Sequence, residues 1–284
     1  MPDAPAVSVP TEYQPPLLDA SPRRRVGAMV LRHWFLLRRS WPRLLELAYW
    51  PTVNMLLWGF TSQFLATNSS WVAQAAGVLI AGVLLWDVVV RSQIGVSISF
   101  LEELWSRNLG NLFVSPLRPR EWVASLVAMA GIRMVIGLAA PVLLALPVFG
   151  FNLVSEIGLP LVAFIANLML VGVSVGLMTN GVLLRYGLGA ESFSWGAIFI
   201  LAPLSAVYYP VSALPGWLQA VSLALPTSHV FEGMRSVLFQ GVMRWDHLAA
   251  AVALNLFYLA LAGLFFARTF RKARETGALL QASE

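Results

Sequence analysis

The sequence contains no cysteine and has few charged residues. Without thiolates it cannot hold zinc or an iron–sulfur cluster through sulfur, and it cannot form disulfides. Charged residues make up 12% of the chain, against about 25% in soluble domains. Hydrophobic residues reach 58% of its 284 residues. A soluble chain of this size needs polar side chains over its surface, so the composition predicts that lipid surrounds most of the protein.

The sequence also lacks common enzymatic motifs. It has no G-x-x-x-x-G-K-[ST] loop, and its only lysine, Lys272, lies near the C-terminus, so it cannot bind and hydrolyse ATP by itself. The three histidines are far apart in the sequence, and we predict no metal site. A G-x-S-x-G match at Gly172–Gly176 lies in an apolar segment, where G-x-x-x-G helix packing is the better interpretation. We therefore expect no enzyme and no cofactor bound to this chain.

Long apolar segments indicate the fold class. A bilayer span needs about 20 apolar residues. Six segments are long enough, at 44–66, 72–100, 121–150, 156–184, 190–208 and 246–268. The sequence predicts an all-α polytopic membrane protein with a six-span domain over 44–270. The apolar stretch 209–243 is interrupted by Pro210, Pro215 and Pro226, and we expect short re-entrant helices there.

The cationic residues predict the orientation. The net charge of +5 does not indicate nucleic-acid binding, because the cations flank the apolar segments and form no single patch. With six spans, fifteen arginine and lysine residues lie on the side of the N-terminus, and only Arg235 and Arg244 lie on the other side. Cationic residues accumulate in cytoplasmic loops. Both termini, including a tail at 271–284, are therefore predicted to be cytoplasmic.

Two segments precede the first predicted span. Residues 1–22 are rich in proline and are expected to be disordered. In 23–43, Arg25, Arg32 and Arg39 recur every seven residues opposite an aromatic and aliphatic face. This pattern is typical of an amphipathic helix in the lipid headgroup region. The alternative is an ordinary helix docked on the rest of the protein.

Three charged residues fall within predicted spans. Asp87 and Arg91 are four residues apart, so they share one helix face and can neutralise each other. Arg133 needs a partner, and Asp87 is the obvious candidate. The three charges are interpreted either as a polar lining along a substrate route or as a buried cluster that stabilises packing. The sequence leaves both interpretations open.

The predicted cytoplasmic loop 101–120 combines charged and aromatic residues before Pro116. A short amphipathic element held between two long helices suits a groove on a partner protein. It could equally lie against the protein's own cytoplasmic ends. The candidate docking residues are Glu102, Glu103, Leu104, Trp105, Arg107, Asn111 and Phe113.

Two motifs carry a resemblance to a known family. The first is E-E-L-W-S-R-N-L-G-N-L-F-V-S-P-L-R-P-R-E-W, from Glu102 to Trp122, and the second begins Y-Y-P-V-S-A-L-P-G-W-L-Q at Tyr208 and extends to Arg235. With the preceding basic helix and six spans, the chain resembles the membrane subunits of type-two ATP-binding-cassette exporters, over roughly residues 24–270.

The resemblance implies a function. The 101–120 loop would carry the coupling helix that docks on a separate ATPase, which binds ATP and Mg²⁺. Two permease copies and two ATPases would assemble in a bacterial inner membrane and move a lipid, glycan or drug-like substrate outward. The re-entrant segment supplies candidates for an outer gate: Pro210, Pro215, Pro226, Glu232 and Arg235. The competing interpretation is an ATP-independent transporter or lipid scramblase that uses Asp87, Arg91 and Arg133 as an ion relay.

Overall fold

The computed structural model describes residues 21–68 and 70–276, without the side chains of 65–76, 110 and 113–114. The predicted disorder of the first 20 residues and the last part of the C-terminal tail lie outside this range. The described part of the chain is helical and contains no strand. Its helices are α1 (Pro22–Arg39), α2 (Trp41–Asn68), α3 (Ser70–Trp105), α4 (Leu109–Val114), α5 (Pro119–Phe149), α6 (Leu153–Ile157), α7 (Pro160–Tyr186), α8 (Glu191–Leu201), α9 (Gly216–Leu223), α10 (Pro226–Gln240) and α11 (Trp245–Glu275).

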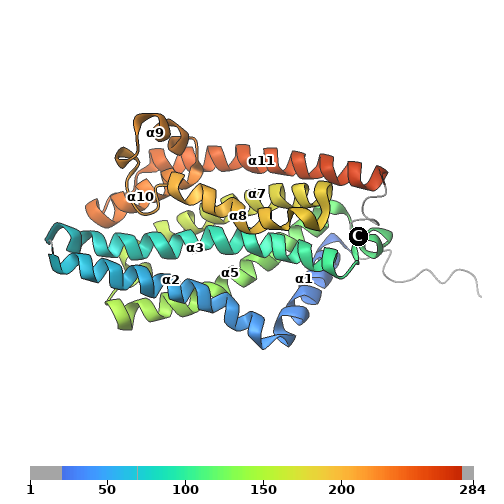
Figure 1. Cartoon of the computed structure of the whole chain (residues 1–284), viewed down its shortest axis with the longest axis horizontal. Helices are drawn as coiled ribbons and strands as arrows, with labels where there is room; N and C mark the ends of the chain where they lie inside the picture. The colour runs from blue at the N-terminus through green and yellow to red at the C-terminus, as the bar shows by residue number, and fades with distance from the viewer. Residues whose placement is uncertain (1–20, 69, 277–284) are drawn as a thin grey trace, which may run out of the picture.

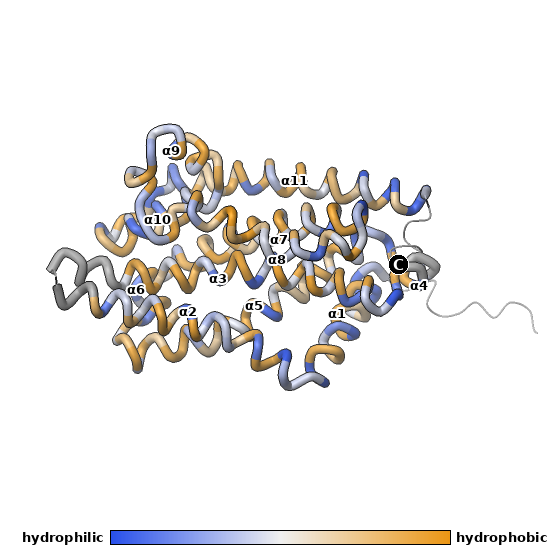
Figure 2. Tube along the Cα trace, viewed as in Figure 1, coloured by the Kyte–Doolittle hydropathy of each residue, from blue (hydrophilic) through white to orange (hydrophobic). Residues whose placement is uncertain are grey.

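The long helices run along one axis, and α3 is the central one (Figure 1). It packs on α2, α5 and α7, while α11 covers the other side of α7. The inclined helix α1, the loop around α4 and the end of α11 lie at one end of the bundle, whereas α9 and α10 lie at the other. Figure 2 shows hydrophilic residues concentrated toward these two ends and hydrophobic residues along the bundle between them.

Four segments in the described residues are long and apolar enough to cross a membrane: Gly77–Trp105, Pro119–Phe149, Pro160–Leu204 and Trp245–Glu275. They contain most of the second, third and sixth predicted spans. Pro160–Leu204 contains most of both the fourth and the fifth predicted spans, 156–184 and 190–208. The first falls in α2, which is long enough to cross a membrane but is not among these four. The structure thus supports a multi-pass helical protein with four candidate spans, and the six-span count remains a proposal.

The segment Pro160–Leu204 is bent and not one straight helix. Helix α7 ends at Tyr186, and Gly187 has a φ of +68°, a conformation that glycine adopts without the strain of a side chain. After a 3-10 turn at Gly187–Ala190, helix α8 packs back on α7. Helix α8 alone has 11 residues, about 17 Å of helix, which is shorter than a hydrocarbon core of about 30 Å.

Two glycines allow α7 to approach α3 closely. A Cβ atom at Gly172 would lie 2.5 Å from the Val89 carbonyl oxygen, and one at Gly176 would lie 2.9 Å from the Val96 Cβ. Both separations are too short for a real side chain. The packing interpretation of the G-x-x-x-G pattern is therefore confirmed, and the Ser174 hydroxyl simply donates to the Leu170 carbonyl within its own helix.

We predict that Gly172→Ala destabilises the protein, because its methyl group must push α7 away from the α3 backbone. Overpacking of this kind costs about 1–3 kcal/mol. Gly196→Ala is the matched control, since a Cβ there meets nothing within 4 Å. The thermal midpoint in detergent should fall for the first variant and hold or rise for the second. Equal midpoints would contradict the close approach.

Candidate functional site

Helix α1 is docked on the protein by its arginines. Arg25 donates from Nη2 to Glu121 Oε1 at 2.7 Å and from Nε to Oε2 at 2.9 Å, and this carboxylate raises the pKa of Arg25. Arg32 pairs with Glu103, whereas Arg39 is exposed. Two of the three arginines therefore face protein carboxylates, as the docked-helix alternative predicted.

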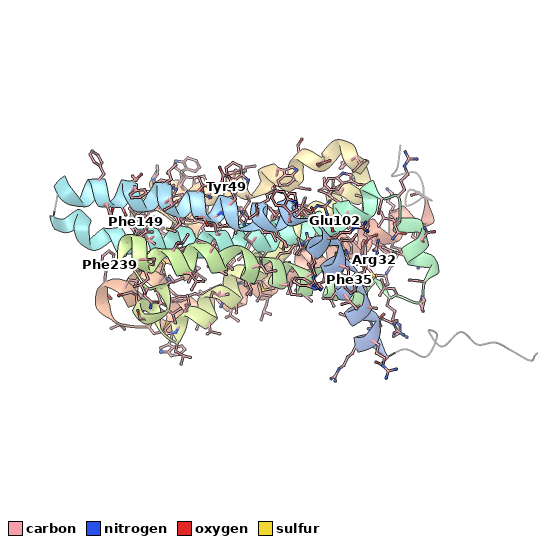
Figure 3. The ribbon with its side chains drawn as sticks, turned by 90° about the horizontal axis from the view of Figure 1, so that it is seen from below. Arg32, Phe35, Tyr49, Glu102, Phe149 and Phe239 are labelled. Atoms are coloured by element: carbon pink, nitrogen blue, oxygen red, sulfur yellow. The ribbon has the colours of Figure 1, made fainter. Side chains whose placement is uncertain are left out.

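Part of the α1 surface beside the arginines is apolar and uncovered. Leu31, Phe35 and Leu36 are 51%, 56% and 43% exposed, while Met29, His33 and Leu37 are buried against the bundle. Figure 3 shows Arg32, Phe35 and Glu102 at the same end of the molecule. The exposed apolar side chains suit the membrane interface, so α1 combines a protein-facing charged side with a surface suited to lipid.

Glu103 is fully buried at the end of α3. Its carboxylate pairs with Arg32 and accepts a hydrogen bond from Asn108 Nδ2 at 2.8 Å, and His33 Nε2 lies 3.5 Å away. Burying a carboxylate is costly unless cations and donors compensate it. Glu103 therefore joins α1 to α3 and to the loop that follows α3.

Glu102 joins α3 to two other helices. Its carboxylate accepts from Arg133 Nη2 of α5 at 3.1 Å and from Arg43 Nη1 of α2 at 2.9 Å. The side chains of Glu102 and Arg133 are 8% and 5% exposed, so this is a buried pair, whereas Arg43 is 49% exposed. Glu102 and Glu103 thus point into the protein, where they support the loop from within.

The expected pairing of Arg133 with Asp87 is wrong, because Glu102 is the ion-pair partner of Arg133. Helical side chains lean toward the N-terminus of their own helix. Helices α3 and α5 run in opposite directions on either side of the 106–118 loop. Arg133 therefore leans toward the loop, and Glu102 leans away from the loop, toward Arg133. Asp87 leans in the same direction as Glu102 but lies farther from the loop than Arg133, so it leans away from Arg133.

Asp87 and Arg91 are both buried, but no ion pair between them is found among the described side chains. Asp87 Oδ2 and Arg91 Nε have no hydrogen-bond partner in the structure. The Arg91 side chain passes Gly137 of α5, where its Cδ would lie 3.4 Å from an added Cβ. The three intramembrane charges therefore form no continuous relay in this structure.

The exposed part of the loop begins at Trp105, whose side chain is 45% exposed. Arg107 follows with a φ of 53°, which turns the chain sharply after α3, and both Arg107 and Asn111 are exposed. Leu104, Leu109 and Leu112 are buried, so they anchor the loop in the core. Helix α4 includes Phe113, whose side chain lies outside the described residues.

The opposite end of the bundle is held by Arg235 of α10. Its guanidinium donates to the carbonyls of Ala206, Val207 and Tyr209, and burial lowers its pKa while the charge of Glu232 opposes that effect. Glu232 Oε1 accepts from the Val211 backbone N–H at 2.7 Å. These contacts connect α10 to the chain that leads into it.

The three prolines of this segment lie where short helices begin. Pro210 and Pro215 are the residues before the 3-10 turn Val211–Ala213 and before α9, and Pro226 is the first residue of α10. Proline is well accommodated in a first helical turn, where its missing N–H has no partner to lose. The short broken helices predicted from the prolines are confirmed, and their re-entry into the membrane stays a prediction.

One contact between two histidines was not predicted from the sequence. His229 and His247 are 18 residues apart, yet their Nδ1 atoms lie 3.1 Å from each other. His229 Nε2 donates to the Leu223 carbonyl, so His229 Nδ1 accepts and His247 donates when both rings are neutral. Within the described residues no group of three His, Cys, Asp or Glu side chains could hold a metal ion.

A helical bundle with two polar ends is the architecture expected of a membrane protein, and the comparison with protein families identifies which kind. The family model described as ABC-2 type transporter matches residues 25–239. The chain belongs to the ABC-2 type transporter family. The match places the described helical bundle, with its four candidate spans, in a family of transporter membrane domains.

A curated relative supports the same assignment. ABC transporter G family member 20 of Dictyostelium discoideum is 29% identical over 147 residues. The match covers 51% of this chain but only 20% of that protein, so the chain matches about one fifth of the relative's length. Membership of the ABC-2 family rests on the longer family match, and the matched region includes the Glu102–Trp122 loop and α10.

We predict that Glu102 and Arg133 are energetically coupled. Either Glu102→Gln or Arg133→Gln leaves one buried charge with less compensation, at a cost of about 3–5 kcal/mol. The double variant should recover part of that loss in a thermal or denaturant unfolding assay. The matched control combines Asp87→Asn with Arg133→Gln, whose effects should add. Recovery in the control and not in the test pair would restore the Asp87 assignment.

Proposed function

We propose that this permease exports a lipid, glycan or drug-like substrate, driven by ATP and Mg²⁺ in a separate ATPase subunit. The observation that carries the proposal is the exposed Trp105 on a loop whose carboxylates are tied into the bundle. An aromatic side chain on a rigid support suits a groove on a partner. The contact surface we propose consists of Trp105, Arg107 and Asn111.

The buried carboxylates support a mechanical role for this loop. Movement of Trp105 is carried to α1 through Glu103, and to α2 and α5 through Glu102. Leu109 and Leu112 belong to the same hydrophobic cluster as Phe100, Trp122 and Phe266. A displacement of the loop therefore acts on several spans together, which is the requirement for converting ATPase closure into opening of a pathway.

At the other end, we propose that the segment 209–243 forms the outer gate. Its arrangement depends on Arg235, which donates to three carbonyls of the preceding chain, and on Glu232, which accepts from Val211. The pathway would lie between two permease copies. The exposed aromatic and aliphatic side chains of α2, among them Tyr49, Trp50, Leu57 and Phe60, suit a second copy as well as lipid.

An ATP-independent transporter or scramblase is less well supported. That mechanism needs Asp87, Arg91 and Arg133 to form a relay, and Arg133 is engaged by Glu102 instead. In addition, the ABC-2 family implies an ATPase partner. The proposed membrane is a bacterial inner membrane with both termini in the cytoplasm. The start of α1 and the end of α11 lie at the same end of the bundle, which agrees with this orientation.

Trp105→Ala should leave the permease folded but weaken ATPase binding. Truncation of an aromatic anchor typically costs about 2 kcal/mol or more, which corresponds to at least roughly tenfold in affinity. Co-purification of the ATPase and substrate-stimulated hydrolysis in vesicles measure the effect. Trp245→Ala removes a more exposed tryptophan, 72% exposed, from the other end of the bundle, and this variant should bind the ATPase normally. Normal binding and transport by Trp105→Ala would exclude the coupling role.

The orientation can be tested with single cysteines, because the native chain has none. Asn111 lies in α4, and Ser212 lies in the 3-10 turn before α9, at the opposite end of the bundle. Both residues are exposed, so Asn111→Cys and Ser212→Cys each provide one accessible thiol. An impermeant maleimide added to intact cells should label Ser212→Cys alone, and both variants should react after permeabilisation. Labelling of Asn111→Cys in intact cells would reverse the orientation.

A further inference from the structure

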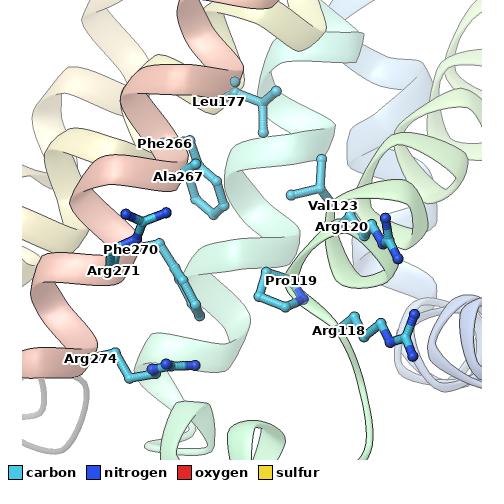
Figure 4. A pocket seen from close by; sticks show the side chains of 11 residues that line it. Arg118, Pro119, Arg120, Val123, Leu177, Phe266, Ala267, Phe270, Arg271 and Arg274 are labelled. Carbon is cyan, nitrogen blue, oxygen red and sulfur yellow. The ribbon is translucent and has the colours of Figure 1, made fainter.

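A pocket lies between α5, α7 and α11, toward the end of the bundle that carries the 106–118 loop. Its volume is about 660 Å³, within the range of about 300–1,000 Å³ that is typical of small-molecule sites. Four arginines line it: Arg118, Arg120, Arg271 and Arg274. In Figure 4, Arg271 and Arg274 of α11 lie across the pocket from Arg118 and Arg120, with Phe270 and Pro119 between the two pairs.

None of the four arginines forms an ion pair with the described residues, although the charge of Arg118 also acts on Glu121, the partner of Arg25. Among the described residues, none that lines the pocket is acidic. The ion pairs found among the described residues involve other cations: Arg25, Arg32, His33, Arg43, Arg133, Arg235 and Arg244. Four like charges around one cavity repel one another, and an anion placed between them relieves that repulsion. Guanidinium groups also match the oxygen geometry of a phosphate through paired hydrogen bonds.

The remainder of the pocket is apolar. Val123, Leu177 and Phe266 line it, and Gly263 leaves a gap, because an added Cβ there would meet nothing within 4 Å. Both α5 and α11 are candidate membrane spans, and the arginines lie in their loop-end turns. A ligand that fills this pocket therefore needs an anionic head at the level of the span ends and an apolar chain directed along the spans.

We infer that this pocket binds an anionic phospholipid of the membrane leaflet at the loop end, with its phosphate among the four arginines and an acyl chain beside Phe266. The chemistry of the lining favours a lipid over a soluble anion because the apolar half would stay empty with phosphate alone. It favours a lipid over a docking protein because the cavity opens between two span helices. The site is separate from the proposed coupling surface at Trp105.

The test measures lipid retention by purified protein with native mass spectrometry. The full chain is exchanged into nanodiscs of phosphatidylcholine containing one fifth phosphatidylglycerol, then released and analysed. Parent protein should retain phosphatidylglycerol in preference to phosphatidylcholine. The double variant R271Q/R274Q should lower this retention at least tenfold. Arg268→Gln is the matched control, because Arg268 is an exposed arginine of the same helix that does not line the pocket.

A second variant tests the contact with the acyl chain separately from the contact with the phosphate headgroup. Gly263→Leu fills the apolar half and leaves all four arginines in place, and it should lower retention without loss of folding, because leucine has a higher helix propensity than glycine. Thermal midpoints verify folding of every variant. Unchanged retention in R271Q/R274Q would overturn the inference, as would equal loss in Arg268→Gln.

Two further outcomes identify other occupants. If inorganic phosphate at millimolar concentration displaces the lipid and Gly263→Leu has no effect, the pocket is a simple anion site and the lipid assignment is wrong. If R271Q/R274Q retains lipid but loses the co-purifying ATPase, the arginines form a protein interface and the assignment is again wrong. Failure of this inference leaves the Trp105 experiment unaffected, so the two proposals are distinguishable.

Discussion

Glu102 and Glu103 are consecutive residues at the end of α3, so their side chains leave the helix about 100° apart. One therefore faces α1 and the other faces α2 and α5. Buried carboxylates need cationic partners, and the packing of α1 on α5 and of α5 on α3 brings Arg32 and Arg133 to them. The arrangement of the loop end depends on this pair of carboxylates.

The same pair determines what the loop can present to a partner. Because both carboxylates point inward, they leave Trp105, Arg107 and Asn111 outside. The loop is thus rigid where it meets the bundle and exposed where it turns. That combination suits an element that transmits movement, since a flexible loop would absorb the displacement before it reached α3 or α5.

Buried charged groups have different kinds of partner at the two ends of the bundle. At the loop end, charged side chains pair with one another, and four arginines remain for an external anion. At the far end, Arg235 is compensated mainly by backbone carbonyls that the broken helices leave without partners. Between the ends, contact between helices depends on small residues such as Gly172 and Gly176, as expected where lipid removes the hydrophobic drive for helix association.

The sequence alone determined the membrane class, the helical fold, the family and the positions of three spans, because hydropathy and local motifs are properties of neighbouring residues. It also located the breaks at Pro210, Pro215 and Pro226, since proline acts on its own helix. Only the tertiary structure decided that Arg133 pairs with Glu102, that His229 meets His247, and that Arg118 and Arg271 line one cavity. These contacts join distant segments, and they depend on which helix faces oppose each other and on the direction in which each side chain leans.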